Sequence, residues 1–180
     1  MLRTFVAAEI NNKELLDSIK KTQSELDLRA KPINPENMHF TLLFLGEISE
    51  QIAYKVQDSL NKIEFSEFDV SFRGIGAFPK ARAPRIVWIG TDEEGGRQLC
   101  DLAIQVQNAL SPLGFHSDKP FRAHITIFRI KNQIGNISDK LERYSSKSFG
   151  VQKISEIKLK RSILTPEGPN YSDLQVIKAK

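Results

Sequence analysis

Two histidines in this sequence lie in matching settings that suit acid–base chemistry. His39 is followed two residues later by Thr41 on an apolar run, and His124 is followed in the same way by Thr126. Successive side chains of a strand point to opposite faces, so each histidine shares a face with its threonine. One such pair on a strand is usually structural, but two pairs in matched context predict a functional site.

If both histidines face one cleft, they can serve as general base and general acid in a single reaction. The unperturbed pKa of histidine, about 6.5, allows one imidazole to be neutral and the other protonated near pH 7. Each threonine hydroxyl can donate a hydrogen bond to an anionic oxygen. Two imidazoles and two hydroxyls that converge from opposite sides suit a tetrahedral phosphate undergoing in-line displacement.

The residue five positions after each histidine differs between the two copies: it is Phe44 in the first and Arg129 in the second. Strict alternation places this residue on the face opposite the histidine, unless a bulge or twist turns it back to the rim of the cleft. At the rim, the ring and the guanidinium can hold a nucleobase by stacking and cation–π contact. Arg129 can alternatively reach the phosphate, and the sequence leaves both roles open.

The other candidate residues have weaker links to chemistry. His116 lies in a loop-like segment without a partner motif, and Trp88 lies in an apolar run that predicts a core position. Cys100, the only cysteine, falls on the apolar stripe of a predicted helix; it excludes a disulfide framework and fits a cytoplasmic location. No carboxylate stands at a ligand spacing beside either histidine, so we expect no metal and no other cofactor.

Length and composition indicate a single globular domain. The chain has 180 residues, with 26 Lys+Arg against 22 Asp+Glu, and the resulting charge of +4 is compatible with a polyanionic substrate. No apolar run approaches the roughly 20 residues needed to span a bilayer. The short apolar run at the N-terminus ends at Glu9 and predicts a first strand rather than a signal peptide. We expect a monomer without membrane association.

The order strand, helix, His-x-Thr strand occurs twice in the predicted elements. The first copy comprises a strand at 2–9, a helix at 12–29 and the His39 strand, closed by Gly46. The second comprises a strand at 86–90, a helix at 95–113 and the His124 strand. This repetition predicts a pseudo-two-fold duplication that places the two His-x-Thr strands on opposite sides of one cleft.

Further elements complete the predicted domain. They are a helix that Ser49 caps, a β-prone run reaching residue 75, a short helix at 136–143, strands at 148–164, a turn at 165–169 and a last strand at 171–177. A proline-bounded basic loop at 78–85 separates the halves, about 1–80 and 81–180. A loop of this kind is most often a solvated surface, although its charges also suit contact with a substrate.

At these motifs the chain resembles the 2H phosphoesterase superfamily and, within it, the RNA 2′,3′-cyclic phosphodiesterase branch, also called the LigT or 2′-5′ RNA ligase family. The resemblance covers essentially the whole chain. The segments that carry it are Arg3–Glu9, Asn34–Gly46, Pro120–Arg129 and Leu164–Tyr171. Ala123 takes the place of a proline that usually precedes the second histidine, and we expect little effect from this change.

The resemblance implies a bilobal α+β fold in which two antiparallel sheets flank a central cleft, with helices outside. It also implies metal-independent hydrolysis of an RNA 2′,3′-cyclic phosphate to a 2′-phosphate. In family terms, His39 is the proton donor to the leaving 3′ oxygen and His124 is the acceptor that activates water. The residues that bind substrate are then Thr41, Thr126, Arg129 and, beside the base, Phe44.

Two other functions stay open from the sequence. Some members of the family join 2′,3′-cyclic phosphate and 5′-hydroxyl RNA ends into a 2′-5′ linkage, with a ribose hydroxyl in place of water. A module that holds RNA through the basic loop and Arg129, without catalysis, is the second alternative. Replacement of either histidine separates catalysis from binding, because only catalysis needs both imidazoles.

Overall fold

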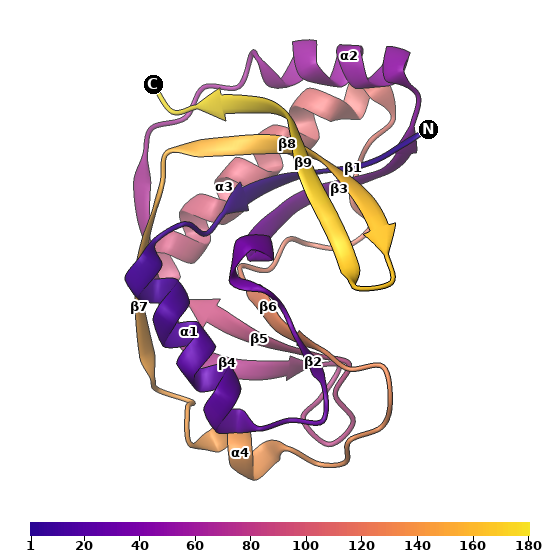
Figure 1. Ribbon diagram of the computed structural model, residues 1–180. Helices are drawn as coiled ribbons and strands as arrows, with labels where there is room; N and C mark the ends of the chain where they lie inside the picture. Colours follow the sequence, from indigo (N-terminus) through magenta and orange to yellow (C-terminus); the bar gives the residue numbers. More distant parts are fainter.

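The computed structural model describes residues 1–180, which form two antiparallel sheets (Figure 1). The first sheet has the strand order β3 (His39–Ile48), β1 (Leu2–Glu9), β8 (Glu156–Thr165), β9 (Gly168–Lys178). The second has the order β2 (Lys31–Pro32), β6 (Ile125–Arg129), β5 (Ile86–Thr91), β4 (Phe68–Phe78), β7 (Ser148–Ile154). Apart from the short β2, each sheet thus carries its His-x-Thr motif at one edge, beside the strand that opens the repeat. The predicted α+β, pseudo-two-fold architecture is confirmed.

The three longer helices each begin after a side chain that caps the first turn. The helices α1 (Lys13–Leu26), α2 (Glu50–Leu60) and α3 (Glu93–Leu110) are preceded by Asn12, Ser49 and Asp92. Their side-chain oxygens accept a backbone N–H three residues on, at 3.0, 3.3 and 3.0 Å, which satisfies a donor that the first turn leaves free. The shorter elements are α4 (Ser138–Glu142) and 3-10 turns at Pro35–Asn37 and Ser111–Leu113. No helix is both long and apolar enough to cross a membrane.

Several boundaries differ from those predicted, each for a local reason. Helix α1 ends at Leu26 rather than at residue 29, because Asp27 has a left-handed φ of 42°. Strand β3 continues to Ile48 beyond Gly46, whose φ of 73° accommodates an irregularity in the pairing with β1 instead of ending the strand. Strand β6 begins at Ile125, so His124 immediately precedes its strand instead of lying within it.

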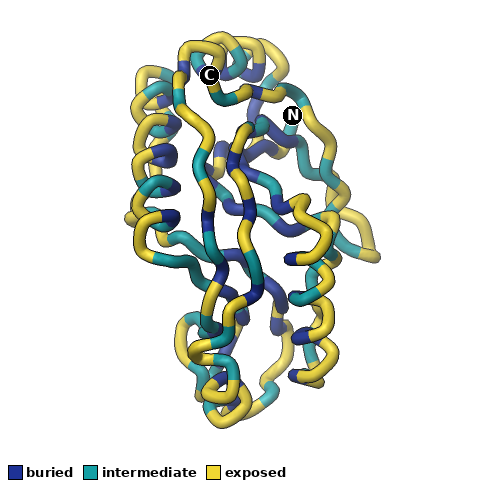
Figure 2. Tube along the Cα trace, turned by 90° about the vertical axis from the view of Figure 1, so that its left-hand side faces the viewer, coloured by how far each residue is buried: buried dark blue, intermediate teal, exposed yellow.

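One core of 37 buried residues joins both sheets and the helices. Near the motif strands, Phe40 of β3 and Phe72 of β4 stack with ring centroids 5.4 Å apart and an interplanar angle of 22°. Figure 2 shows the buried positions along the inner strands, while the helices expose their outer sides. Each sheet also includes strands from both sequence halves, since β4 joins the second sheet and β8 and β9 join the first. The shared core and the exchanged strands therefore hold the two sheets, and with them the two motif strands, at a fixed separation.

Candidate active site

A cleft of about 1940 Å³ lies between the two sheets and holds the predicted site residues. Those from the first sheet are His39, Thr41 and Phe44, and those from the second are His124, Thr126 and Arg129. The structure therefore brings all six side chains to one cavity, although the two groups are far apart in the sequence.

The main chain holds both histidines in the same way. His39 Nδ1 lies 2.8 Å from the carbonyl oxygen of Asn37, and His124 Nδ1 lies 2.7 Å from the carbonyl oxygen of Arg122. A carbonyl oxygen can only accept a hydrogen bond, so Nδ1 carries the hydrogen in each ring. Nε2 is therefore the nitrogen through which each imidazole can take up or release a proton.

A bulge in β3 turns Phe44 back toward the cleft. Leu42 is the extra residue of the bulge, because the pairing with β1 passes directly from Thr41 to Leu43. Leu42 and Leu43 are consequently both buried, with 5% and 3% of their surface exposed. Phe44 then returns to the face of His39, where 66% of its surface is exposed. The bulge thus overrides the strict alternation that would place Phe44 in the core.

The second motif carries a bulge at the same position. Here Ile127 is the extra residue, because the pairing with β5 passes directly from Thr126 to Phe128. Ile127 and Phe128 are both buried, and Arg129 is exposed and lines the cleft. In both copies the bulged residue is the third after the histidine. The bulge turns the fifth residue, Phe44 or Arg129, toward the cleft.

Gln23 of α1 supports this second bulge, and its role was missed in the sequence. The Gln23 side-chain amide donates to the carbonyl oxygen of Ile127 at 2.8 Å, and the backbone N–H of Ile33 donates to the same oxygen at 2.9 Å. These bonds satisfy the carbonyl of the bulged residue. One signal was available: Gln23 is a polar residue at an apolar-stripe position, between Ile19 and Leu26.

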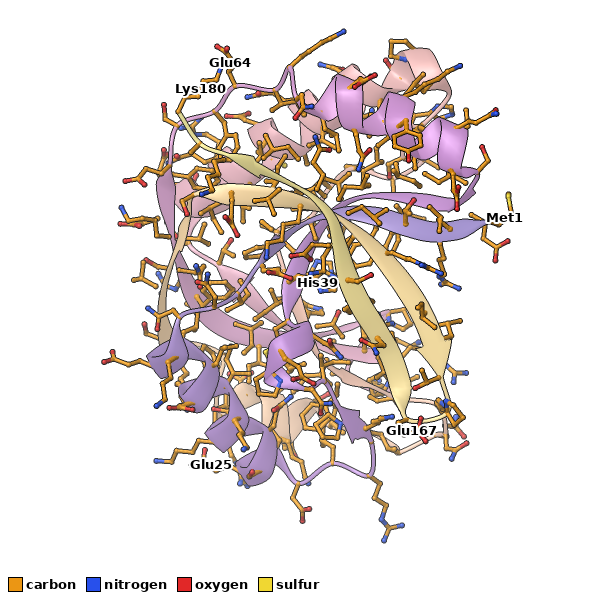
Figure 3. The ribbon with its side chains drawn as sticks, turned by 45° about the horizontal axis from the view of Figure 1, so that its top comes forward. Met1, Glu25, His39, Glu64, Glu167 and Lys180 are labelled. Atoms are coloured by element: carbon orange, nitrogen blue, oxygen red, sulfur yellow. The ribbon has the colours of Figure 1, made fainter.

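The His39 ring is enclosed by aromatic side chains of the first sheet. Its centroid lies 5.0 Å from that of Phe5 and 5.5 Å from that of Tyr171, which meets it edge-on at 86°. Tyr171 comes from β9, and Figure 3 shows His39 beneath the β8–β9 hairpin. The Asn37 side-chain amide also donates to the carbonyl oxygen of Pro169 at 3.3 Å, which ties this hairpin to the segment that holds His39. From the sequence, Tyr171 is expected at the start of the last strand and belongs to a family motif, but no role in the site is predicted for it.

The His124 ring packs against a different aromatic pair, Phe78 and Trp88, with centroid distances of 5.2 and 6.4 Å. The prediction that Trp88 is a core residue is wrong. Trp88 is only partly buried, because its pairing with Thr126 places it on the cleft side of the sheet. The Arg122 guanidinium lies 5.9 Å from the centroid of Phe78, so a positive charge borders this side of the site.

A cluster of four charged side chains lies next to His39. Lys158 bonds Glu9 at 2.5 Å and Asp173 at 2.9 Å; Lys160 bonds Asp173 at 2.6 Å and also bonds Glu9. Burial opposes ionisation of Glu9 and Asp173, but the lysines outweigh it and lower the pKa of both carboxyls. Glu9 pairs directly with His39 in the β1–β3 register, so this cluster forms part of the histidine's electrostatic surroundings.

Burial lowers the pKa of both histidines. The pKa of His39 falls to about 4, because burial and the charges of Lys160 and Arg129 outweigh the Asn37 carbonyl and Glu9, which favour the imidazolium. Arg129 lines the same cleft as His39, so a residue of the second sheet contributes to the electrostatic surroundings of the first histidine.

The pKa of His124 is also lowered, first by burial and then by the charge of Arg122, against the favourable hydrogen bond to the Arg122 carbonyl. The shift is smaller than that of His39, whose ring is more enclosed. Both imidazoles are therefore neutral at pH 7 in the free protein.

The remaining candidates, His116 and Cys100, line the same cleft. His116 is exposed there, and Cys100 is partly buried, with its thiol donating to the carbonyl oxygen of Phe121 at 3.6 Å. No three histidine, cysteine or acidic side chains converge in a way that could hold a metal ion. The two imidazoles, each with Nε2 left without a main-chain partner, can transfer protons in this cavity, with hydroxyl and guanidinium donors beside them.

Comparison with known proteins relates the chain to one family of phosphoesterases. The family model described as LigT like phosphoesterase matches residues 10–88 and 89–171. A protein of Archaeoglobus fulgidus named RNA 2′,3′-cyclic phosphodiesterase is 42% identical over 177 residues, which cover 97% of this chain and 99% of the relative. A protein of the same name from Aeropyrum pernix is 36% identical over 168 residues, covering 92% and 93%.

Solved structures agree with this relationship. TT0787 of Thermus thermophilus has a TM-score of 0.80 at 28% identity, covering 98% of this chain and 97% of that one. E. coli LigT complexed with 3′-AMP also has a TM-score of 0.80, at 22% identity, covering 99% and 98%. The second likeness supports the fold alone.

Proposed function

Because the chain belongs to the family of LigT-like phosphoesterases, we propose that it hydrolyses the 2′,3′-cyclic phosphate at the end of an RNA. The observation that carries the proposal is the pair of imidazoles in one cleft, each with Nδ1 bound to a carbonyl and Nε2 left for proton transfer. The names of the relatives, RNA 2′,3′-cyclic phosphodiesterase, support the substrate class.

The proposed reaction needs one proton removed and one proton delivered. Water attacks phosphorus and forms the new P–O bond while the bond from phosphorus to the 3′ oxygen breaks. One imidazole takes the proton of the water at Nε2, and the other, as imidazolium, delivers a proton from Nε2 to the 3′ oxygen. The product carries a free 3′-hydroxyl and a 2′-phosphate. No metal ion takes part in this scheme.

We assign proton delivery to His39 and proton removal to His124, following the family pattern. The free protein holds both rings neutral, so the substrate must help to protonate His39. An anionic phosphate beside the ring favours the imidazolium, and the Glu9 carboxylate acts in the same direction. His124 is already neutral, as a general base requires.

The remaining cleft residues suit binding of the substrate. We assign phosphate contacts to the hydroxyls of Thr41 and Thr126 and to the guanidinium of Arg129. The exposed ring of Phe44 offers a stacking surface for the terminal base, an interaction worth about 1–3 kcal/mol per base in single-strand binding proteins. The bulges support these roles, because they turn Phe44 and Arg129 toward the cleft that holds both histidines.

End-group analysis of the product tests the proposal. An oligonucleotide with a defined 2′,3′-cyclic phosphate end is incubated with the protein in the presence of a strong chelator. We expect conversion to a 2′-phosphate end. A 3′-phosphate product, activity that requires added zinc or magnesium, or predominant joining to added 5′-hydroxyl RNA would each contradict the proposed hydrolysis.

We further propose that the enzyme acts as a monomer in the cytoplasm. The single cysteine, which forms no disulfide, fits a reducing compartment.

A further inference from the structure

Four basic side chains from three separate segments follow one another from the cleft to the surface beside it. Lys31 of β2 lies directly opposite Arg129 of β6, and Arg129 lies opposite the residue that follows Arg85. The Arg85 carbonyl accepts the N–H of Ile130 at 2.9 Å, and the Arg85 guanidinium donates to the carbonyl oxygen of Lys131 at 3.2 Å. We call these four residues, Lys31, Arg85, Arg129 and Lys131, the basic track.

The charges of the basic track are not matched by acidic partners. All four side chains belong to exposed residues, and none forms an ion pair, whereas Arg97 and Lys153 elsewhere on the surface each pair with two carboxylates. Lys31 donates only to a neutral backbone carbonyl, that of Glu167 at the hairpin tip labelled in Figure 3. Like charges directly opposite each other on paired strands are destabilising, so the facing pair of Lys31 and Arg129 does not serve stability.

The basic track begins at the reaction centre and leads away from it. Arg129 is close enough to His39 to lower its pKa, and Lys31 and Lys131 line the same cleft. Arg85 lies beyond Lys131, outside the cleft lining. Unpaired cations that follow one another along a groove are the arrangement that attracts the phosphates of a nucleic-acid backbone.

We propose that the basic track binds the RNA backbone on the 5′ side of the terminal cyclic phosphate, so that the enzyme prefers oligonucleotides to mononucleotides. This inference rests on the proposed function. A terminal 2′,3′-cyclic phosphate leaves the chain only its 5′ side on which to continue, so backbone outside the reaction centre must leave in that direction. Arg85, the last residue of the basic loop at 78–85, is the residue that this loop contributes to the basic track.

Two substrates separate the track from the reaction centre. One is 2′,3′-cyclic AMP, and the other is an RNA hexanucleotide that ends in the same cyclic adenosine phosphate. We expect kcat/KM at low salt to be about tenfold higher for the hexanucleotide, because each phosphate contact adds affinity through release of counterions. The variant R85Q/K131Q should lose most of this preference through a higher KM for the hexanucleotide, with far smaller changes for the mononucleotide.

The salt dependence gives a second readout. The slope of log kcat/KM against log salt for the hexanucleotide should become shallower by about 1.4 in R85Q/K131Q, since each single-strand phosphate contact contributes about 0.7. The variant K55Q/K62Q removes the same charge from exposed positions outside the cleft and should behave like the wild type. Equal loss in this control would overturn the inference, as would an unchanged preference in R85Q/K131Q or no preference in the wild type.

A binding measurement keeps this test separate from that of the proposed function. If the wild type hydrolyses neither substrate, the proposed function fails, but the track can still be tested. Fluorescence anisotropy with a dye-labelled hexanucleotide that ends in a 3′-phosphate should show weaker binding to R85Q/K131Q than to the wild type or K55Q/K62Q. Equal affinity for all three proteins would overturn the track itself.

Discussion

His39 and His124 are positioned by the same main-chain devices on opposite sides of the cleft. Each ring donates Nδ1–H to the carbonyl two residues before it, each shares its motif with a threonine, and each is followed by a bulge at the third position. The surroundings of the two rings are different. His39 is enclosed by Phe5 and Tyr171 beside an ionic cluster of Glu9, Lys158, Lys160 and Asp173, whereas His124 packs against Phe78 and Trp88 on a more open side.

The contrast separates two tasks that an acid–base pair must meet. Repeated backbone geometry holds Nδ1 of each ring on a main-chain carbonyl and leaves Nε2 of each ring free in one cleft, which sets the positions of the two catalytic groups. Unequal enclosure sets how readily each ring takes a proton, and it lowers the pKa further for His39 than for His124. A duplicated fold can thus supply matched geometry, while local side chains make the two copies chemically unequal.

The largest expected effect comes from removing either ring. In H39A and in H124A we expect kcat for a 2′,3′-cyclic phosphate to fall by about 10²–10⁴-fold, the usual contribution of general acid–base catalysis. The double variant should lose little more than the worse single variant, since both protons move in one step. Steady-state kinetics checks this, with H116A as the control, because His116 lines the cleft but lies outside both His-x-Thr motifs. Near wild-type turnover in either single variant would show that the reaction does not need both histidines.

A smaller decrease in kcat should follow from removing one aromatic side chain that packs against a histidine. In Y171A the His39 ring loses its edge-on neighbour, and in F78A the His124 ring loses its own. We expect about a tenfold lower kcat in each, because a misplaced catalytic group loses alignment, with a smaller change in KM. Y171F keeps the ring and should retain activity. Equal losses in Y171F and Y171A would assign the effect to the hydroxyl instead of to packing.

The smallest expected effect is a difference in proton uptake. NMR titration of the free protein should give a pKa near 4 for His39 and a value below 6.5, but higher than that of His39, for His124. Added inorganic phosphate should raise both values, since a bound anion favours the imidazolium. Equal pKa values for the two rings would contradict the claim that the greater enclosure of His39 makes the two histidines chemically unequal.

Stability should follow the same titration. Between pH 6.5 and about 4 the unfolded chain binds protons that the folded His39 does not, so the free energy of unfolding should decrease as the pH falls through this window. Thermal unfolding at several pH values checks the sign. In H39A the decrease should be weaker, because that difference in proton binding is gone.

Much of the architecture was predictable because it depends on local pattern. Ser49 caps a helix where the sequence indicates, and the repeated order of strand, helix and motif strand predicts the two-sheet fold. Local pattern fails where a residue depends on its partner strand. Trp88 looks like a core residue in its apolar run, but its register with β6 places it beside His124. Gln23 likewise gains its role only from a carbonyl 104 residues away.

The sequence by itself determined the two His-x-Thr motifs, the face that each histidine shares with its threonine, and the repeat that joins them, because strand periodicity is a local property. Only the tertiary structure decided that Phe44 and Arg129 face the cleft. A bulge is a mismatch between two strands, so it exists only once β3 is paired with β1 and β6 with β5. The enclosure of His39 by Tyr171 and the convergence of the basic track also depend on segments that meet only in the folded chain.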